Sequence, residues 1–241
     1  MLDCLLVADR GAGAVRVVRT AQRLGVKAVA VHTGDDTDHA RDADERVLLG
    51  ARGYCDVPGL LEAAAYAGAR GIHPGWGPLA ADPGLAQAVM DAGLVWVGAA
   101  PEVLARTRTR ADDHGDVEVQ VLGLAGGRVV SLGERSVRAP ITAPVVDERT
   151  RAVLTTAAIV AAQQAGLVGL ATVAARGVEV VGLRPWLEPA HVVTEAVTGI
   201  DLVEQQLLVA LGDRPSYDVD ALVLSGSAVA DLDGDAVVLR G

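Results

Sequence analysis

Short apolar runs alternate with longer segments of helical spacing through the first hundred residues, and this alternation restricts the fold more than any other feature. Helices are predicted for residues 10–25, 57–68 and 82–93, and apolar runs of strand length cover residues 2–8, 27–33, 71–74 and 94–98. The third helix has the clearest start, because Asp82 can cap its free N–H groups and Pro83 fits its first turn. Strands joined through helices lie parallel, so the sequence predicts an α/β domain with a Rossmann-like parallel sheet.

The pattern changes after residue 104. Residues 105–116 are charged and polar, which is typical of a linker. Beyond them, glycine-containing turns join apolar strands into hairpins. The predicted elements are hairpins over residues 117–134, 170–183 and 226–241, the last turning at Asp233-Gly234, and helices over residues 147–166 and from Asp201. Antiparallel strands packed against helices predict a second domain of the α+β class.

Composition excludes several classes of function. The chain contains no Phe, so its core is expected to consist of Val, Leu and Ala. A net charge of −10 argues against nucleic acid and anionic membranes as partners, because both need clustered Lys and Arg. Cys4 and Cys55 match no metal-binding spacing and fit a reducing compartment. With no signal-peptide pattern and no apolar run of membrane length, a cytoplasmic protein is expected.

Two segments in the first domain have the composition of a binding site. GAGAVR (residues 11–16) follows a strand and opens a helix, but Arg16 occupies the place of the third glycine of a dinucleotide-binding loop, which favours a simple tight turn. Residues 32–45 contain two His and six carboxylates without a rigid framework, and we interpret them as a solvated loop rather than a metal site.

Other candidates are weaker. HPGWG (residues 73–77) ends a strand, where open α/β sheets place their ligands, although a rigid turn with a packed Trp76 explains it equally well. DLDGD (residues 231–235) lacks the glycine and the final Glu of a calcium loop, so a hairpin turn is expected. Ser131, Ser136 and Ser216 stand in no context typical of a catalytic triad.

Four segments in order resemble one known family, the biotin carboxylases, which are the ATP-grasp subunits of biotin-dependent carboxylases. The similar segments are residues 5–50, 71–89, 116–135 and 191–207. The resemblance implies a pre-ATP-grasp domain (1–104), a linker in place of the ATP-grasp lid (105–116), a reduced, lid-less ATP-grasp-like domain (117–212) and a remnant of the C-terminal domain (213–241). It therefore implies a truncated and degenerate homologue.

The family's site residues are replaced at the matching positions of this chain. By resemblance, the two Mg²⁺-binding glutamates correspond to Ala174 and Gly182, the metal-side Asn to Arg184, the bicarbonate-binding Arg and Gln to Trp186 and Glu188, the general base to Ala190 and the biotin-side Arg to Leu232. Arg110 corresponds to one family lysine. These replacements predict a pseudoenzyme, with no catalytic residues, no metal and no cofactor.

The leading hypothesis for function is a scaffold or regulatory subunit that works with a biotin-dependent carboxylase or its biotin carrier protein. In the family the first helix contributes to the dimer interface, which makes Arg16, Arg19 and Arg23 the interface candidates. Arg23 stands where the family typically has Glu, and a symmetric pair would bring Arg beside Arg. Both a homo-oligomer and a hetero-oligomer therefore stay open.

Two alternatives remain. The first is a small-molecule or nucleotide sensor that uses Arg10, His73, Trp76 and Arg110 as ligand-binding residues. The second is residual ATP-dependent ligase activity in which Glu188 and His191 form an acid–base pair, although two titratable groups three residues apart beside prolines are more typical of a solvated turn.

Overall fold

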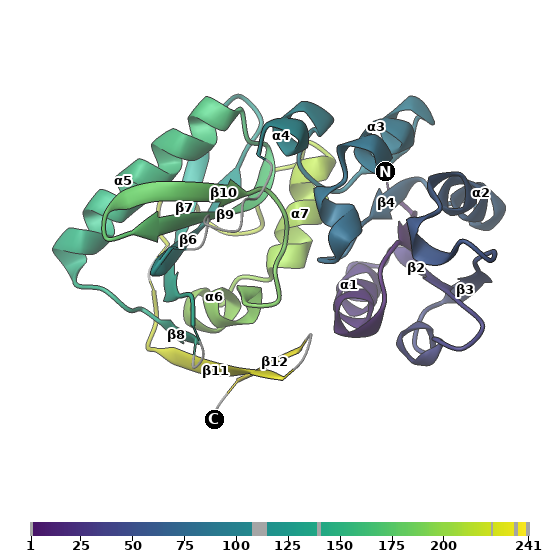
Figure 1. The fold of residues 1–241 in the computed structure, drawn as a ribbon, viewed down its shortest axis with the longest axis horizontal. Coiled ribbons are helices and arrows are strands. Elements are labelled where there is room, and N and C mark those ends of the chain that lie inside the picture. The colour runs from purple at the N-terminus through teal and green to yellow at the C-terminus, as the bar shows by residue number, and fades with distance from the viewer. Residues whose placement is uncertain (1, 108–114, 139–140, 223, 234–235, 240–241) are drawn as a thin grey trace. The chain divides into compact units, whose positions relative to one another are not determined.

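The chain forms two compact units, Met1–Pro101 and Glu102–Gly241. The structure is a computed structural model that describes residues 2–107, 115–138, 141–222, 224–233 and 236–239 (Figure 1). The first unit contains a parallel sheet with helices, and the second contains antiparallel sheets. The predicted fold class is therefore confirmed. The finer division of the second half into residues 117–212 and 213–241 stays a prediction.

The sheet of the first unit has the strand order β3-β2-β1-β4-β5, and all its neighbours are parallel. Its strands are β1 (Cys4–Val7), β2 (Lys27–His32), β3 (Glu45–Leu48), β4 (Gly71–His73) and β5 (Val95–Trp96). The chain winds outward from β1 to β3 and then returns to the other side of β1, so the winding direction reverses between β1 and β4. This reversal is the topological switch point of the sheet, where open α/β folds bind ligands.

Three α-helices connect these strands, close to the predicted ranges. They are α1 (Gly11–Arg23), α2 (Val57–Ala67) and α3 (Pro83–Asp91), with short 3₁₀ turns η1 (Asp38–Ala40), η2 (Gly53–Cys55) and η3 (Pro78–Ala81). The predicted cap of α3 is present, because the Asp82 carboxylate accepts hydrogen bonds from the N–H groups of Gly84 at 2.8 Å and Leu85 at 3.2 Å. Strand β3 was not predicted. Alternate side chains of this edge strand are exposed, so it lacks an apolar run.

The second unit is built on a four-stranded antiparallel sheet in the order β10-β9-β6-β7. The strands are β6 (Val117–Gly123), β7 (Val129–Ser136), β9 (Gly169–Arg176) and β10 (Glu179–Arg184), and the helices are α4 (Pro101–Arg106), α5 (Glu148–Ala165), α6 (His191–Thr198) and α7 (Leu202–Ala210). The two predicted hairpins are thus confirmed. The predicted helix starts hold as well, since Asp147 caps α5 and Asp201 caps α7.

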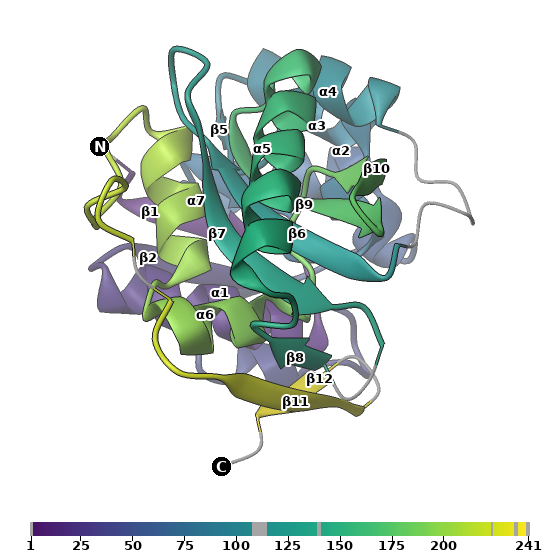
Figure 2. The same ribbon diagram turned by 90° about the vertical axis from the view of Figure 1, so that its left-hand side faces the viewer.

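A smaller sheet in the second unit joins the end of the chain to its middle. It contains β8 (Ile141–Ala143), β11 (Ala228–Asp233) and β12 (Ala236–Leu239), and β11 pairs antiparallel with both neighbours (Figure 2). This pairing confirms the predicted last hairpin, although Gly234 of its turn lies outside the described residues. Side chains of β8 and β11 form one apolar cluster with Val193 and Val197 of α6. Among the described residues, none of the helices is both long and apolar enough to cross a membrane.

Gly75 gives a direct test of the packing between β1 and β4. Gly75 and Gly93 both have positive φ, 69° and 72°, so alanine at either position would be strained by about 1–2 kcal/mol. A Cβ on Gly75 would also lie 1.8 Å from Oδ2 of Asp9, whereas a Cβ on Gly93 would meet no atom within 4 Å. We therefore expect Gly75→Ala to lower the free energy of unfolding clearly more than Gly93→Ala, measured by urea denaturation. Equal losses would contradict the close approach of Asp9.

Candidate functional site

The switch point of the first unit is occupied by a buried carboxylate. Asp9 follows β1 and is only 8% exposed. Its Oδ2 atom accepts a hydrogen bond from the N–H of Trp76 at 3.0 Å, and the main chains of the two strand ends are joined by Ala8 N–H and His73 O at 2.9 Å. Burial raises the pKa of Asp9, and hydrogen bonds from the backbone N–H groups of Arg10 and Trp76 oppose that rise.

Asp9 and Trp76 together fill the space above the start of α1. A Cβ added to Gly13 would lie 2.2 Å from Oδ2 of Asp9 and 3.0 Å from Cε2 of Trp76. In a dinucleotide-binding fold this space at the helix N-terminus receives the pyrophosphate. A carboxylate there would repel phosphate, and the indole would block it. The geometry agrees with the interpretation of GAGAVR as a tight turn.

The structure brings only some of the predicted ligand-binding residues together. His73 is fully buried and its Nδ1 atom accepts a hydrogen bond from the N–H of Gly75 at 2.9 Å, so it stabilises the turn that carries Trp76. Arg10 is directed elsewhere, with Nη1 3.4 Å from Oδ2 of Asp36. Arg110 lies outside the described residues. A ligand role for these residues stays a prediction.

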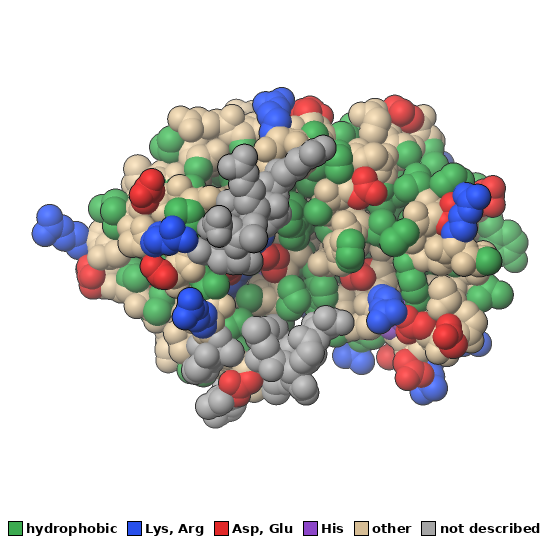
Figure 3. All heavy atoms as spheres, in the orientation of Figure 1, with side chains coloured by type: hydrophobic (Ala, Val, Ile, Leu, Met, Phe, Trp, Pro, Cys, Tyr) green, Lys and Arg blue, Asp and Glu red, His purple; other side chains and the backbone are tan. Residues whose placement is uncertain are grey.

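The acidic segment after β2 is held together by local pairs. His39 is buried, with Nε2 2.8 Å from the main-chain oxygen of Val31 and Nδ1 3.4 Å from Oδ1 of Asp36. On the face shown in Figure 3, basic and acidic side chains are interspersed over the first unit. In this segment, Nη2 of Arg41 lies 2.8 Å from Oδ1 of Asp38. Within the described ranges, no three His, Cys, Asp or Glu side chains are arranged to hold a metal ion.

The second unit contains a buried polar cluster that is centred on Arg135 of β7. Its guanidinium donates hydrogen bonds to Glu118 (3.1 Å), Gln120 (2.8 Å), Thr194 (3.1 Å) and Thr172 (3.2 Å), and its side chain is fully buried. Glu118 and Gln120 lie two apart on β6, opposite Arg135 and Thr172 respectively, so their side chains share one face of the sheet. Thr194 reaches the same face from α6.

Arg184 extends this cluster to the end of β10. Glu118 uses one carboxylate oxygen for Arg135 and the other for Nη2 of Arg184. Glu188 binds Arg184 through both oxygens, at 2.7 Å to Nε and 3.1 Å to Nη2. Burial alone would lower the pKa of Arg184, but its hydrogen bonds and charge interactions with Glu188 and Glu118 hold the pKa above its usual value. The positive charges of two guanidinium groups are thus neutralised by the negative charges of two carboxylates in a buried cluster.

The resemblance implies a Mg²⁺ site beside this cluster, and the surrounding side chains show whether Mg²⁺ could bind there. Ala174 and Gly182 are directly paired across β9 and β10, and Ala174 also pairs with Glu118 on β6. Neither Ala174 nor Gly182 offers a side-chain oxygen, and the Arg184 guanidinium lies beside them. The nearby carboxylates of Glu118 and Glu188 are already bound to Arg184. A divalent cation would therefore meet a positive charge instead of free oxygen ligands, and the described residues do not fit it.

Of the remaining predicted positions, Trp186 and Ala190 lie just before the start of α6. Trp186 and Ala190 are half-buried, and Leu232 lies on β11. The predicted acid–base pair does not form, because the Glu188 carboxylate binds Arg184. His191 Nδ1 instead meets the main-chain oxygen of Glu188 at 2.9 Å.

Sequence reasoning missed Glu118 and Arg135 as members of the site. A signal was present, because polar residues stand two apart in an otherwise apolar strand segment. The partner strand could not be identified without the pairing of the sheet.

Comparison with known proteins shows what the chain is similar to. Residues 1–104 match the model of the biotin carboxylase N-terminal domain. Biotin carboxylase of Halalkalibacterium halodurans is 27% identical over 95% of this chain and 74% of its own length. The chain is a biotin carboxylase homologue. That alignment covers 335 positions, more than the 241 residues of this chain, so within it the relative has residues that have no counterpart in this chain.

Two further relatives extend the comparison. The biotin-dependent acyl-coenzyme A carboxylase alpha3 subunit of Mycobacterium leprae is 47% identical over 104 residues, which cover 41% of this chain and only 17% of that protein. The crystal structure of a complete multifunctional pyruvate carboxylase from Rhizobium etli superposes with a TM-score of 0.86 at 26% identity, over 95% of this chain and 26% of that chain. Relatives of this biotin carboxylase homologue thus include a subunit of a biotin-dependent acyl-coenzyme A carboxylase and a multifunctional pyruvate carboxylase.

The comparisons contradict one prediction. The replaced site positions predict a pseudoenzyme, but relatives that resemble this homologue are named biotin carboxylase, and biotin carboxylases are enzymes. The replaced residues do not by themselves show that activity is lost. The effects of several replacements on the rate cannot simply be multiplied when the residues act as a unit. The prediction that the protein is not an enzyme is therefore wrong.

Replacing Asp9 tests the electrostatics of the switch point. Its folded-state pKa is raised above 3.8, so ionisation of Asp9 weakens the folded state as the pH rises through that pKa. Asp9→Asn is neutral at every pH and keeps an oxygen for the Trp76 N–H. We expect Asp9→Asn to be more stable than the parent protein at pH 7, with the difference vanishing below pH 3.8. Thermal unfolding across this pH range measures it, and a pH-independent difference would refute the burial of the charge.

Replacing Arg135 tests the buried cluster. Arg135→Met leaves Glu118 without one of its two cations, and breaking a buried pair in this way costs about 3–5 kcal/mol of stability. The matched control is Arg41→Met, because the Arg41–Asp38 pair is mostly exposed and such pairs contribute less than about 1 kcal/mol. Adding Glu118→Gln to Arg135→Met should recover part of the loss. Similar small losses for both single variants, in urea denaturation, would be inconsistent with a cluster that depends on Arg135.

Proposed function

We propose that this protein acts as a subunit of a biotin-dependent carboxylase, in a scaffolding or regulatory role, and that it binds a carboxylase component through the outer face of α1. The observation that carries this proposal is the similarity over 95% of the chain to a biotin carboxylase. Residues 1–104 add support, because they match the model of the biotin carboxylase N-terminal domain.

The outer face of α1 carries a row of arginines. Arg16, Arg19 and Arg23 are spaced three and four residues apart, which places them on one side of the helix. The opposite side of α1 is buried against the sheet. Arg19 is 68% exposed, and its pair with Asp42 at 3.6 Å is of the exposed kind that contributes little.

This arginine row indicates the chemistry of the partner. A cluster of positive charge on a chain of net charge −10 favours an acidic surface, since complementary charges steer association. A second copy of the same helix would bring arginines against arginines. The charge pattern therefore supports a hetero-oligomer over the symmetric pair that the resemblance implies.

The alternative functions have less support. At the switch point, Asp9 and Trp76 fill the place of an anionic ligand above α1. In the second unit, the Glu188 carboxylate is engaged by Arg184 instead of by His191. Neither the sensor at the switch point nor the Glu188–His191 acid–base pair is favoured by this geometry.

Reversing the charge of the arginine row tests the proposal. The tagged protein is used to isolate carboxylase components, including the biotin carrier, from its native cells, and the complex is then rebuilt from purified parts. We expect Arg19→Glu with Arg23→Glu to weaken the complex at least tenfold, about 1.4 kcal/mol, and to reduce its salt dependence. Sedimentation analysis measures the affinity.

A matched pair of variants serves as the control. Arg52→Glu with Arg70→Glu makes the same change of charge at exposed positions of the first unit away from α1, and should leave the affinity unchanged. An equal loss in both double variants would reject α1 as the contact. Failure of any carboxylase component to co-purify would reject the subunit role itself.

A further inference from the structure

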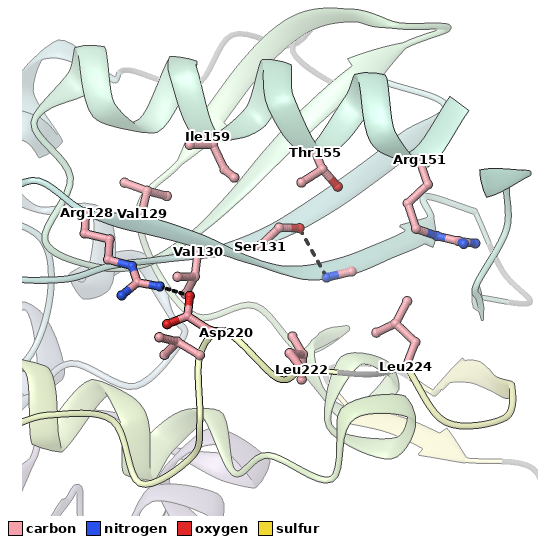
Figure 4. A pocket seen from close by; sticks show the side chains of 12 residues that line it. Arg128, Val129, Val130, Ser131, Arg151, Thr155, Ile159, Asp220, Leu222 and Leu224 are labelled. Carbon is pink, nitrogen blue, oxygen red and sulfur yellow. Dashed lines mark hydrogen bonds and ion pairs between the residues drawn. The ribbon is translucent and has the colours of Figure 1, made fainter. Parts of the chain in front are cut away.

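A cavity of about 340 Å³ lies in the second unit, away from the polar cluster. Figure 4 shows it between β7, α5 and the segment that contains Asp220, Leu222 and Leu224. Four consecutive residues, 128–131, line it. Neighbouring side chains of a strand point to opposite faces of a sheet, so a cavity lined by consecutive residues lies at the edge of the strand and not over one face.

That edge of β7 has no partner strand in the described part of the chain. In the described part of the chain, β7 is the last strand of its sheet and pairs with β6 alone. The N–H of Leu124 donates to the oxygen of Arg128 at 2.7 Å, so Arg128 directs its carbonyl toward β6. Alternation along the strand then turns the main-chain groups of Val129 and Ser131 outward, into the cavity. A strand edge with no second partner strand is a template for another extended chain, and here the cavity is the way to it, because Val129 and Val130 are only 6% and 9% exposed.

The walls of the cavity limit what can pair there. Ile159 and Thr155 of α5 line one wall, and Leu222 and Leu224 line the opposite wall (Figure 4). A paired strand lies about 4.8 Å from its neighbour, and the stretch from Val129 to Gly133 is roughly 13 Å long at about 3.4 Å per residue. Because walls stand on both sides of the edge, the sheet of a second copy would collide with them, whereas a single extended segment brings no neighbouring strand.

Charge distinguishes the two ends of the cavity. At one end Arg128 forms an ion pair with Asp220. At the other end Arg151 is held in place, since Nε and Nη2 bind the buried Glu134 at 2.9 and 3.1 Å and Nη2 also binds the oxygen of Val146 at 2.8 Å. Among the described residues, Nη1 of Arg151 has no hydrogen-bonding partner. This end can receive an acidic side chain without moving the arginine.

We propose that the β7 edge binds an extended segment of a partner protein by strand addition. The main-chain groups of Val129 and Ser131 would pair with the segment. Apolar side chains of the segment would contact Ile159 and Leu222, and an acidic residue would lie at the Arg151 end. Strand addition takes its affinity from main-chain hydrogen bonds and its specificity from pockets for alternate side chains. This inference is independent of the arginine row on α1, so either one can fail alone.

A short synthetic peptide tests the proposal with the full chain. The probe is an acetylated, amidated pentapeptide, Glu-Val-Thr-Val-Glu, whose terminal acids serve both strand directions. We expect it to shift the backbone ¹H–¹⁵N signals of Val129 and Ser131 in a saturable way. The control peptide has proline in place of the central threonine, which removes one N–H donor. It should bind at least tenfold more weakly, since a hydrogen bond contributes about 0.5–1.5 kcal/mol and a strand is distorted as well.

Paired variants of the chain locate the site. Ser131→Pro removes an outward N–H and is tolerated on an edge strand, so it should weaken the peptide about tenfold. Ser131→Ala keeps the main chain and should bind normally. Ile159→Trp fills the cavity and should abolish binding, whereas Val160→Trp, at a neighbouring position that is 44% exposed, should not. Circular dichroism checks that each variant is folded.

Three results would overturn the proposal. One is the absence of any shift at millimolar peptide. Another is equal binding of the proline peptide, or of Ser131→Pro, because either would mean that main-chain pairing plays no part. The third is a shift of the same signals by hexanoate while the peptide has no effect, which would identify the cavity as a site for a small amphipathic acid.

Discussion

The guanidinium of Arg135 is the interaction on which the second unit depends. It is fully buried, and its hydrogen bonds reach β6, β9 and α6 from β7. An unpaired charge in such a place would be very unfavourable, so the strands and the helix must come together in one register to satisfy it. Through Glu118 the same cluster reaches Arg184, and through Arg184 it fixes Glu188 after the end of β10.

In this biotin carboxylase homologue, the same cluster places an arginine, Arg184, at the end of β10. Ala174 and Gly182, which the resemblance aligns with the family's metal ligands, are paired directly across β9 and β10. Their small side chains contribute no charge, and Arg184 supplies a fixed cation next to them. The oxygens of Glu118 and Glu188 bind guanidinium groups. The cations at this end of the sheet are therefore arginine side chains and not a bound metal ion.

Local patterns in the sequence were sufficient for most elements but not for the contacts between them. Asp82, Asp147 and Asp201 marked helix starts because an N-cap acts within a few residues. Strand β3 carries no such signal, since only alternate side chains are buried. The Asp9–Trp76 contact and the Arg135 cluster join residues far apart in the chain. A burial pattern predicts that such side chains are inside, but it does not say which strand faces which.

The cavity at the β7 edge persists because both ends of its outer wall are anchored. At one end, Asp220 is tied to Arg128 by an ion pair. At the other, Leu224 approaches Gly133 so closely that a Cβ there would lie 2.9 Å from the leucine Cδ2, and Gly133 adopts a φ of 95° that favours glycine. These two contacts hold Asp220 and Leu224 in place beside β7. The gap is therefore a consequence of the packing, and it is faced by main-chain groups of β7 that have no backbone partner among the described residues.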